Sequence, residues 1–228
     1  ALDAGVSILE VFFTPPSAGA GDAAAVLRRA ALAGARCAEV SPAVFARIAY
    51  GDRDAGLIAT AARPRRTLAE LDTGECSLVA VMERVEKPGN LGAVLRTAAA
   101  AGVDAVIAAD AVADVYGPNV IRASLGTVFS VALAEAETDE ALRWLEAGGF
   151  RIVAATPKAE QVYSEVDYRR RTAIVLGSEA WGLSPSWGGD SILRVCVPMK
   201  GEVDSLNVSA TAAVLFYEAL RQRGSGQR

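Results

Sequence analysis

Short, uninterrupted apolar runs alternate with helix-like segments through most of this 228-residue chain. Strands buried on both faces read as such runs, whereas strands with one face in water alternate apolar and polar residues. Runs of this kind lie at 78–85, 105–109, 128–132, 151–155, 173–176 and 193–197. Helical patterns lie between or after them, at 89–101, 118–124, 138–147 and 209–221. The alternation predicts an α/β fold with a mostly parallel sheet and helices on both of its faces.

The first sixty residues have a smaller pattern of the same kind. Strands are predicted at 7–13, 37–40 and 56–61, and a Pro- and Gly-containing loop at 14–21. Asp22 and Ser41 have side chains that can cap a helix, and Pro42 suits the first helical position. A small α/β domain is therefore expected at 1–62.

The stretch 63–75, which contains a proline and several arginines, predicts a linker to a second domain at 76–223. The polar end, 224–228, is expected to be a disordered tail. Because the sequence opens without Met, we expect a further segment before it. No apolar run reaches the roughly 18 residues that span a bilayer, and no secretory signal is recognisable, so a cytoplasmic protein is predicted.

The composition restricts the chemistry. Histidine is absent, which excludes a Ser-His-Asp triad and removes the commonest general base. Cys37, Cys76 and Cys196 are far apart in the sequence, so buried thiols are predicted rather than a disulfide framework or a metal site. The net charge of −4 means that contact with a nucleic acid would have to come from local basic patches.

Polar residues follow three of the predicted strands. Asn90 opens a predicted helix, Glu179 follows a strand, and Asn207 lies between Ser205 and Ser209 before the last helix. Each group alone is compatible with ordinary helix capping. The carboxyl ends of parallel strands meet at one edge of a sheet, however, so the three groups together favour a ligand site there.

Two common nucleotide-binding fingerprints are missing. No G-x-G-x-x-G follows a predicted strand, and no G-x-x-x-x-G-K-[ST] occurs. This argues against a standard dinucleotide or P-loop site, although an unrelated nucleotide-dependent enzyme stays open as an alternative. Trp181, close to Glu179, is predicted to pack in the core rather than to stack on a ligand.

Three ordered motifs resemble those of the SpoU-type (TrmH-type) RNA 2′-O-ribose methyltransferases of the SPOUT class. They are 90–98 (NLGAVLRTA), 174–183 (IVLGSEAWGL) and 197–209 (VPMKGEVDSLNVS), and 121–126 (IRASLG) is similar to an intermediate family segment. The resemblance covers about 76–223. The domain at 1–62 is similar, less specifically, to the L30e-like substrate-binding domain of the branch that acts on 23S rRNA, with its beginning missing.

The resemblance implies a catalytic domain whose C-terminal part is threaded into a trefoil knot. It also implies a homodimer without a metal ion, and S-adenosylmethionine as cofactor, held largely by backbone groups of the knotted loops. By position in the motifs, the implied cofactor-binding residues are Thr156, Leu176, Gly177, Val197, Met199, Ser205 and Leu206.

The same resemblance implies the catalytic residues. Arg96 would act at the ribose 2′-hydroxyl, with Asn90, Glu179, Ser205 and Asn207 completing the site. The residues expected to bind RNA are Arg63, Arg65, Arg66 and Arg122. The implied substrate is 23S ribosomal RNA, with transfer RNA as an alternative. A non-catalytic RNA-binding or ribosome-assembly factor on the same scaffold is the second hypothesis.

Overall fold

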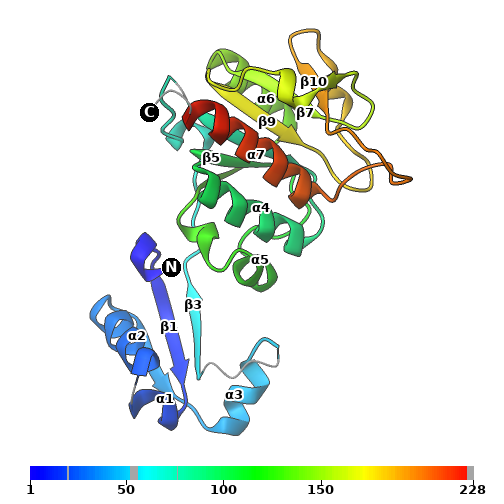
Figure 1. Ribbon diagram of the computed structural model, residues 1–228. Coiled ribbons are helices and arrows are strands. Elements are labelled where there is room, and N and C mark those ends of the chain that lie inside the picture. The colour runs from blue at the N-terminus through cyan, green and yellow to red at the C-terminus, as the bar shows by residue number, and fades with distance from the viewer. Residues whose placement is uncertain (20, 52–55, 76, 225–228) are drawn as a thin grey trace. The chain divides into compact units, whose positions relative to one another are not determined.

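The structure is a computed structural model that describes residues 1–19, 21–51, 56–75 and 77–224 (Figure 1). The chain forms two compact units, Ala1–Pro64 (unit 1) and Arg65–Arg228 (unit 2). The boundary between them falls inside 63–75, the stretch predicted as a linker. Among the described residues, no helix combines the length and the apolar character needed to cross a membrane.

Unit 1 contains a three-stranded sheet with β1 (Ile8–Phe13) in the middle. β2 (Arg36–Glu39) runs parallel to it and β3 (Leu57–Ala61) antiparallel. The helices of unit 1 are α1 (Pro15–Gly19), α2 (Gly21–Leu32), α3 (Pro42–Ile48) and a short 3-10 helix, Leu2–Ala4. The three strands and the last two α-helices lie where the sequence pattern predicts them.

Local capping explains one success and one error in unit 1. The Ser41 hydroxyl accepts a hydrogen bond from the backbone N–H of Val44 at 3.3 Å, which confirms the predicted cap. The prediction of a loop at 14–21 is wrong, because α1 occupies most of it. Pro15 suits the first position of this helix, and the backbone N–H of Ser17 donates to the Thr14 carbonyl at 3.0 Å.

Unit 2 is built on a seven-stranded sheet in the order β6-β5-β4-β9-β7-β10-β8, in which every pair is parallel. The strands are β4 (Leu78–Glu83), β5 (Ala105–Ala109), β6 (Ala132–Ala136), β7 (Arg151–Ala155), β8 (Gln161–Val162), β9 (Thr172–Leu176) and β10 (Leu193–Cys196). The predicted α/β class with a parallel sheet is confirmed. The trefoil knot and the L30e-like assignment stay predictions.

Helices cover both faces of this sheet (Figure 1). They are α4 (Pro88–Ala101), α5 (Pro118–Ala123), α6 (Thr138–Ala147) and α7 (Val208–Gly224). Met82 of β4 packs in one buried cluster with Leu95 of α4 and Phe216 of α7. Val81, the next residue back along β4, belongs to a second cluster with Leu145 of α6. Neighbouring residues of a strand point to opposite faces, so the fully apolar run 78–82 supplies both cores.

Two details of unit 2 differ from the expectations. The strand predicted at 128–132 is wrong, because Thr127–Phe129 forms a 3-10 helix and β6 starts only at Ala132. Gly126, with φ of 85°, turns the chain there, and Ala132 is the first residue to pair with β5. The two-residue strand β8 is too short to produce a sequence pattern.

The predicted linker and tail partly belong to the folded unit. Leu68 and Leu71 are buried in the second core cluster, and a 3-10 helix, Leu68–Glu70, lies within 63–75. Gly224 ends α7, while 225–228 lie outside the described residues.

The prediction that the cysteines are buried thiols is only partly met. Cys37 and Cys196 are half-buried rather than buried, and Cys76 lies outside the described residues. No group of three or more Cys, Asp or Glu side chains suited to a metal ion occurs among the described residues.

Candidate active site

The three polar junctions meet at the carboxyl edge of the sheet in unit 2. β4 and β9 are neighbours in the sheet, and α4 packs against α7. The turn that leads from β4 into α4, the loop after β9 and the start of α7 are thereby brought together.

A hydrogen-bonded cluster joins them. The Glu179 Oε1 atom accepts from Asn90 Nδ2 at 2.7 Å and from Asn207 Nδ2 at 2.5 Å. Asn207 Nδ2 also lies 3.3 Å from Asn90 Oδ1, and Lys87 Nζ forms an ion pair with Glu179 Oε2. The predicted meeting of Asn90, Glu179 and Asn207 is therefore present in the structure, with Lys87 as an addition that the sequence reasoning missed.

Charge pairing keeps the Glu179 carboxylate ionised. Its side chain retains 25% of its full exposure. The hydrogen bond from Lys87 is the main cause that lowers the pKa of Glu179, with the Lys87 charge and the Asn90 amide acting in the same direction. The same contact raises the pKa of Lys87. A carboxylate held ionised in this way suits the orientation of neighbouring amides better than proton abstraction.

Helix capping sets the orientation of the Asn207 amide. Asn207 Oδ1 accepts from the backbone N–H of Ser209 at 2.9 Å and from its hydroxyl at 2.6 Å. The side-chain oxygen thus satisfies the first turn of α7, which leaves the NH₂ group to face Glu179. The capping role and the site role of Asn207 are consequently served by opposite ends of one amide.

Two cavities adjoin the cluster. The smaller, of about 170 Å³, is lined by Lys87, Asn90 and Glu179 among others. The larger, of about 710 Å³, also reaches Glu179 and Asn207. All seven residues predicted to bind the cofactor line the larger cavity: Thr156, Leu176, Gly177, Val197, Met199, Ser205 and Leu206. Ser205, also named as a catalytic residue, lies on this wall and not in the hydrogen-bonded cluster.

The loop after β9 folds back tightly on itself. The backbone N–H of Ser178 donates to the Gly182 carbonyl at 3.1 Å, and the Gly182 N–H donates back at 2.8 Å. A Cβ atom at Gly177 would lie 2.4 Å from the Gly182 backbone, so only glycine fits there. This close approach places Glu179 and Trp181 on a narrow turn beside both cavities.

A buried carboxylate that the sequence reasoning missed anchors the same loop. Glu83, at the end of β4, is fully buried. It accepts hydrogen bonds from the backbone N–H of Ser184 at 2.8 Å, the Ser184 hydroxyl at 2.5 Å and the Thr138 hydroxyl at 3.1 Å. Ser184 lines the larger cavity, so Glu83 positions part of its wall. The sequence did contain a signal for this anchor, because Glu83 is an acidic residue at the end of an otherwise apolar run.

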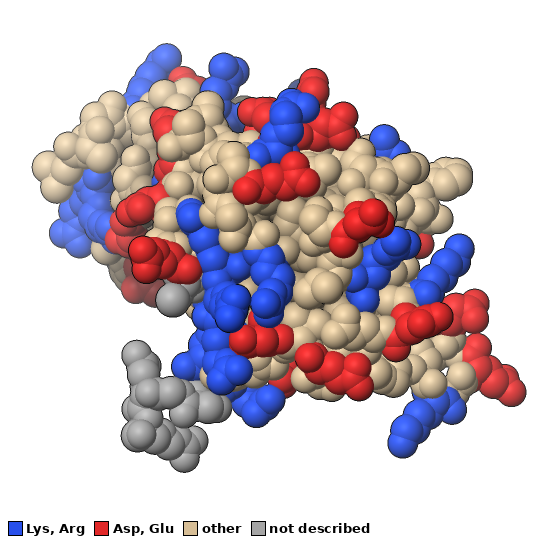
Figure 2. Space-filling view, turned by 90° about the horizontal axis from the view of Figure 1, so that it is seen from above, with Lys and Arg blue, Asp and Glu red and all other residues tan. Residues whose placement is uncertain are grey.

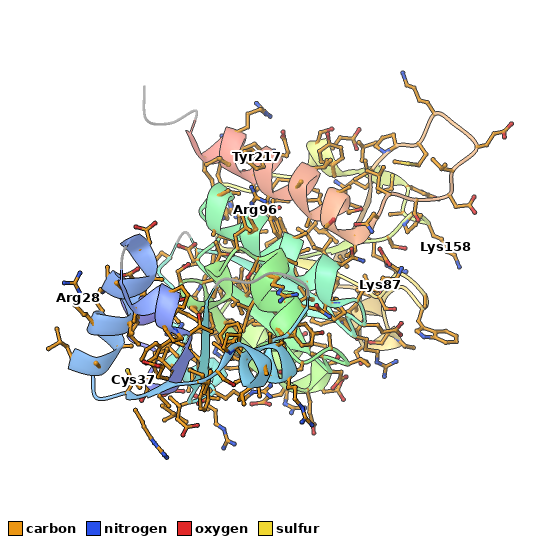
Figure 3. The ribbon with its side chains drawn as sticks, turned by 90° about the horizontal axis from the view of Figure 1, so that it is seen from below. Arg28, Cys37, Lys87, Arg96, Lys158 and Tyr217 are labelled. Atoms are coloured by element: carbon orange, nitrogen blue, oxygen red, sulfur yellow. The ribbon has the colours of Figure 1, made fainter. Side chains whose placement is uncertain are left out.

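Arg96 lies apart from the cluster. It is exposed on α4, six positions after Asn90, which corresponds to roughly 9 Å along a helix axis. Figure 3 shows Arg96 towards Tyr217 and Lys87 towards Lys158. Arg96 is not among the residues that line either cavity, and its catalytic role stays a prediction.

The residues predicted to bind RNA are all exposed. Arg63 belongs to unit 1, Arg65 and Arg66 precede the 3-10 helix of unit 2, and Arg122 lies on α5. None of these arginines lines a cavity described above.

This chain is similar to known proteins. A 23S rRNA (uridine(2479)-2′-O)-methyltransferase of Streptomyces viridochromogenes is 33% identical over 180 residues, which are 75% of this chain and 62% of that enzyme. This chain therefore spans less than two thirds of that relative's length.

Solved structures are similar as well. The SpoU methyltransferase AviRb from Streptomyces viridochromogenes, in complex with the cofactor AdoMet, has a TM-score of 0.87 and 26% identity, covering 99% of this chain and 87% of that one. A structure described by its 2-OH methylation of C/U34 on tRNA has a TM-score of 0.59 and 31% identity, covering 67% of this chain and 99% of that one.

A family model covers the part of the chain that carries the site. The model of the SpoU rRNA Methylase family matches residues 77–217, which include the whole polar cluster and both cavities. This chain belongs to the SpoU rRNA methylase family.

Proposed function

We propose that this protein transfers the methyl group of S-adenosylmethionine to a ribose 2′-hydroxyl of RNA. The observation that carries the proposal is the cluster of Asn90, Glu179 and Asn207 beside the cavity that all seven predicted cofactor residues line. Membership of the SpoU family and the AdoMet-bound relative support the same activity.

The cavity suits the cofactor. Its volume of about 710 Å³ lies within the range of roughly 300–1,000 Å³ typical of small-molecule sites. Leu176 and Trp187 supply apolar walls, while Thr156 and Ser205 add hydroxyl groups and Gly177 leaves its backbone accessible. When bound, S-adenosylmethionine supplies a sulfonium methyl group that its positive charge already activates, so the task left to the protein is mostly alignment.

The polar cluster would align the acceptor ribose. Glu179 accepts from both Asn90 and Asn207, which holds the two amides in one orientation. The amide groups can then present their remaining hydrogen-bonding capacity to ribose hydroxyls. Alignment of bound reactants contributes up to roughly 7–11 kcal/mol to lowering a barrier.

Arg96 would act on the RNA rather than on the cluster. A guanidinium remains protonated at neutral pH, so it does not serve as the base. We assign it to clamping the phosphate next to the acceptor ribose and stabilising the developing 2′-alkoxide, while a substrate phosphate takes the proton. Since Arg96 lies outside both cavities, the substrate has to bridge it to the cluster.

The substrate we favour is 23S ribosomal RNA. A structure described as an AdoMet-bound rRNA methyltransferase from Sinorhizobium meliloti covers 96% of this chain, with a TM-score of 0.87 and 26% identity, whereas the tRNA-related structure covers 67% of it. Figure 2 shows a group of basic side chains near the middle of the face seen from above, with acidic and further basic side chains around it. The net charge is −4. Local patches of this kind suit phosphate contact. Transfer RNA is the second candidate.

The active form is proposed to be a cytoplasmic homodimer. Tyr217 and Leu220 are partly exposed apolar residues three positions apart on α7, and therefore lie on one side of that helix. A contact through this side would cover them. Sedimentation of the wild type and of the double variant Y217S/L220S tests this, and unchanged monomeric sedimentation of both would contradict it.

The main test is Arg96→Ala. We expect its affinity for S-adenosylmethionine, measured by calorimetry, to stay within a few-fold of wild type, because Arg96 does not line the cavity. Single-turnover methylation should fall by about 10²–10⁴-fold. Arg143→Ala, an exposed arginine on α6, is the control and should retain full activity. Normal turnover by the Arg96 variant would refute its assignment.

A second test separates the enzyme from a non-catalytic assembly factor. Wild-type protein is incubated with labelled S-adenosylmethionine and either 23S rRNA or tRNA, and methylated riboses are mapped. Incorporation into rRNA supports the favoured substrate, and incorporation into tRNA selects the second candidate. Tight RNA binding without cofactor binding or methylation would select the assembly factor.

A further inference from the structure

Trp181 is unusual among the tryptophans of this chain. It is 78% exposed, whereas Trp187 is 1% exposed and Trp144 is half-buried. The prediction that Trp181 packs in the core is therefore wrong. A tryptophan buries a large apolar area when it packs, so a ring left in solvent calls for an explanation.

The exposed ring stands on a pinned turn. Ser178 and Gly182 form paired backbone hydrogen bonds across the base of the turn. The Ser178 hydroxyl also accepts from the backbone N–H groups of Ala180 and Trp181, at 3.1 and 3.4 Å. The backbone that carries Trp181 is thus ordered before any ligand binds, which lowers the entropic cost of using the ring as a contact.

The position of the turn connects Trp181 to the reaction site. Trp181 lines the larger cavity together with Glu179 and Asn207 of the polar cluster. Two basic side chains, Lys158 and Arg194, line the same cavity, along with two acidic side chains, Glu179 and Asp204. Figure 3 shows Lys158 and Lys87 towards the same end of unit 2. An aromatic ring beside basic groups is the combination that binds single-stranded nucleic acid.

The high exposure of the Trp181 ring favours an RNA base over the cofactor as its ligand. Small-molecule sites bury about 70–90% of their ligand, and the buried walls of the cavity are supplied by residues such as Leu176 and Trp187. Trp181 lines the same cavity but is 78% exposed, so its ring is open to a ligand that reaches the cavity from solvent. A flat, unstacked base of the RNA can stack on the Trp181 ring while the acceptor ribose contacts the polar cluster.

We propose that Trp181 is a stacking platform for a base of the RNA substrate, adjacent to the acceptor ribose. This inference rests on the proposed function and adds a substrate contact to it. Base–aromatic stacking corresponds to roughly a 5- to 150-fold change in affinity per base. The contact depends on the flat ring and not on hydrogen-bond readout, so Trp181 contributes affinity more than sequence discrimination.

The test compares three variants of the full chain: W181A, W181L and W181F. Phe retains an aromatic face, Leu retains apolar bulk without one, and Ala retains neither. We measure the dissociation constant for an RNA that wild-type protein methylates, the dissociation constant for S-adenosylmethionine and the sedimentation of the free protein. W181A and W181L should lose roughly 5- to 150-fold in RNA affinity, W181F should stay near wild type, and cofactor affinity should not change.

Each other outcome overturns the stacking role. Unchanged RNA affinity in W181A would overturn the stacking role. If the wild-type protein still methylates RNA, the proposed function stands. Equal affinity of W181L and W181F indicates apolar packing without stacking. A change confined to cofactor affinity makes Trp181 part of the cofactor wall, and a change in sedimentation makes it a contact between two copies. Failure of the wild type to methylate any RNA is a separate result, which counts against the proposed function itself.

Discussion

The two units of this protein use their sheets differently. In unit 2 both faces of a seven-stranded sheet are covered, and the residues of β4 and β9 are almost wholly buried. Among the described residues of unit 1, Val11, Ala30 and Ala35 form a small buried cluster beside the three-stranded sheet. A site that must hold groups in fixed positions needs the support of a packed scaffold, and the candidate site lies in unit 2.

Unit 1 also leaves several large apolar side chains exposed. Leu32 is 89% exposed, and Leu9 and Tyr50 keep about half of their exposure. Scattered apolar residues of this kind are common on protein surfaces. Unit 1 is accordingly expected to contribute contacts rather than chemistry, and the following predictions test that division from the largest effect to the smallest.

Removal of core volume should affect unit 2 most. Ile174 on β9 is fully buried, so Ile174→Ala should lower the free energy of unfolding by about 2–5 kcal/mol. Leu9→Ala on β1 of unit 1 is the matched surface change and should stay within about 0.5 kcal/mol of wild type. Urea unfolding measures both. A loss at Leu9 as large as that at Ile174 would contradict the contrast between the two units.

Loss of the buried Glu83 carboxylate should come next. Glu83→Ala leaves the backbone N–H and hydroxyl of Ser184 without their acceptor, which should destabilise the protein by about 1–3 kcal/mol. Affinity for S-adenosylmethionine should also fall, because Ser184 lines the cavity. Glu10→Ala, a partly exposed carboxylate of unit 1 paired with Arg36, is the control and should change neither quantity measurably. Unaltered cofactor binding in the Glu83 variant would remove Glu83 from the site.

Loss of charge near the boundary of the units should have a smaller, salt-dependent effect. Changing Arg63, Arg65 and Arg66 together to Ala should weaken RNA binding and flatten the slope of log affinity against log salt by up to about 2. The charge-matched control is the triple change to Ala of three exposed arginines of unit 2, Arg143, Arg169 and Arg221. An unchanged slope in the first variant, or an equal change in the control, would show that the boundary arginines have no special role.

The smallest effect expected is on pH dependence. Lys87 lowers the pKa of Glu179, so the stability from that pair is present above about pH 4.5 and is lost as the pH falls through the lowered value. The pKa of Lys87 is raised, so its contribution is present below about pH 10.5 and is lost as the pH rises further. The stability difference between wild type and K87M should therefore be constant near neutral pH and shrink at both extremes.

Unit 1 offers a comparison for this titration. Arg29 lowers the pKa of Asp3 by a hydrogen bond and by its charge, in a pair that lies in water. The stability difference between wild type and R29M should therefore shrink at acid pH in the same way, and R29M should methylate RNA as the wild type does. In K87M the amides of Asn90 and Asn207 still hold Glu179, so its pKa, followed by NMR, should rise only part of the way to its ordinary value. A full return would mean that the amides do not support the carboxylate.

Much of unit 2 was predictable because its strands are buried on both faces. A run such as 78–82 cannot be placed at a surface without exposing a whole apolar face, so its place inside a parallel sheet follows from its composition. The motifs added the cofactor residues, all of which line one cavity. The predicted strand at 128–132 failed because short apolar runs also occur in 3-10 turns, where a glycine such as Gly126 redirects the chain.

The sequence by itself determined the kinds of residue that end each strand of unit 2 and the order in which they appear: Asn90, Glu179 and Asn207 were identifiable before any coordinates. Only the tertiary structure decided that Lys87 joins them, that Glu83 anchors the loop and that Trp181 faces solvent while Arg96 stays apart. The physical reason is that capping and burial patterns depend on neighbours along the chain, whereas these contacts join residues about one hundred positions apart, as in the pair of Glu83 and Ser184. Such contacts depend on which strands lie side by side, and no local pattern encodes that arrangement.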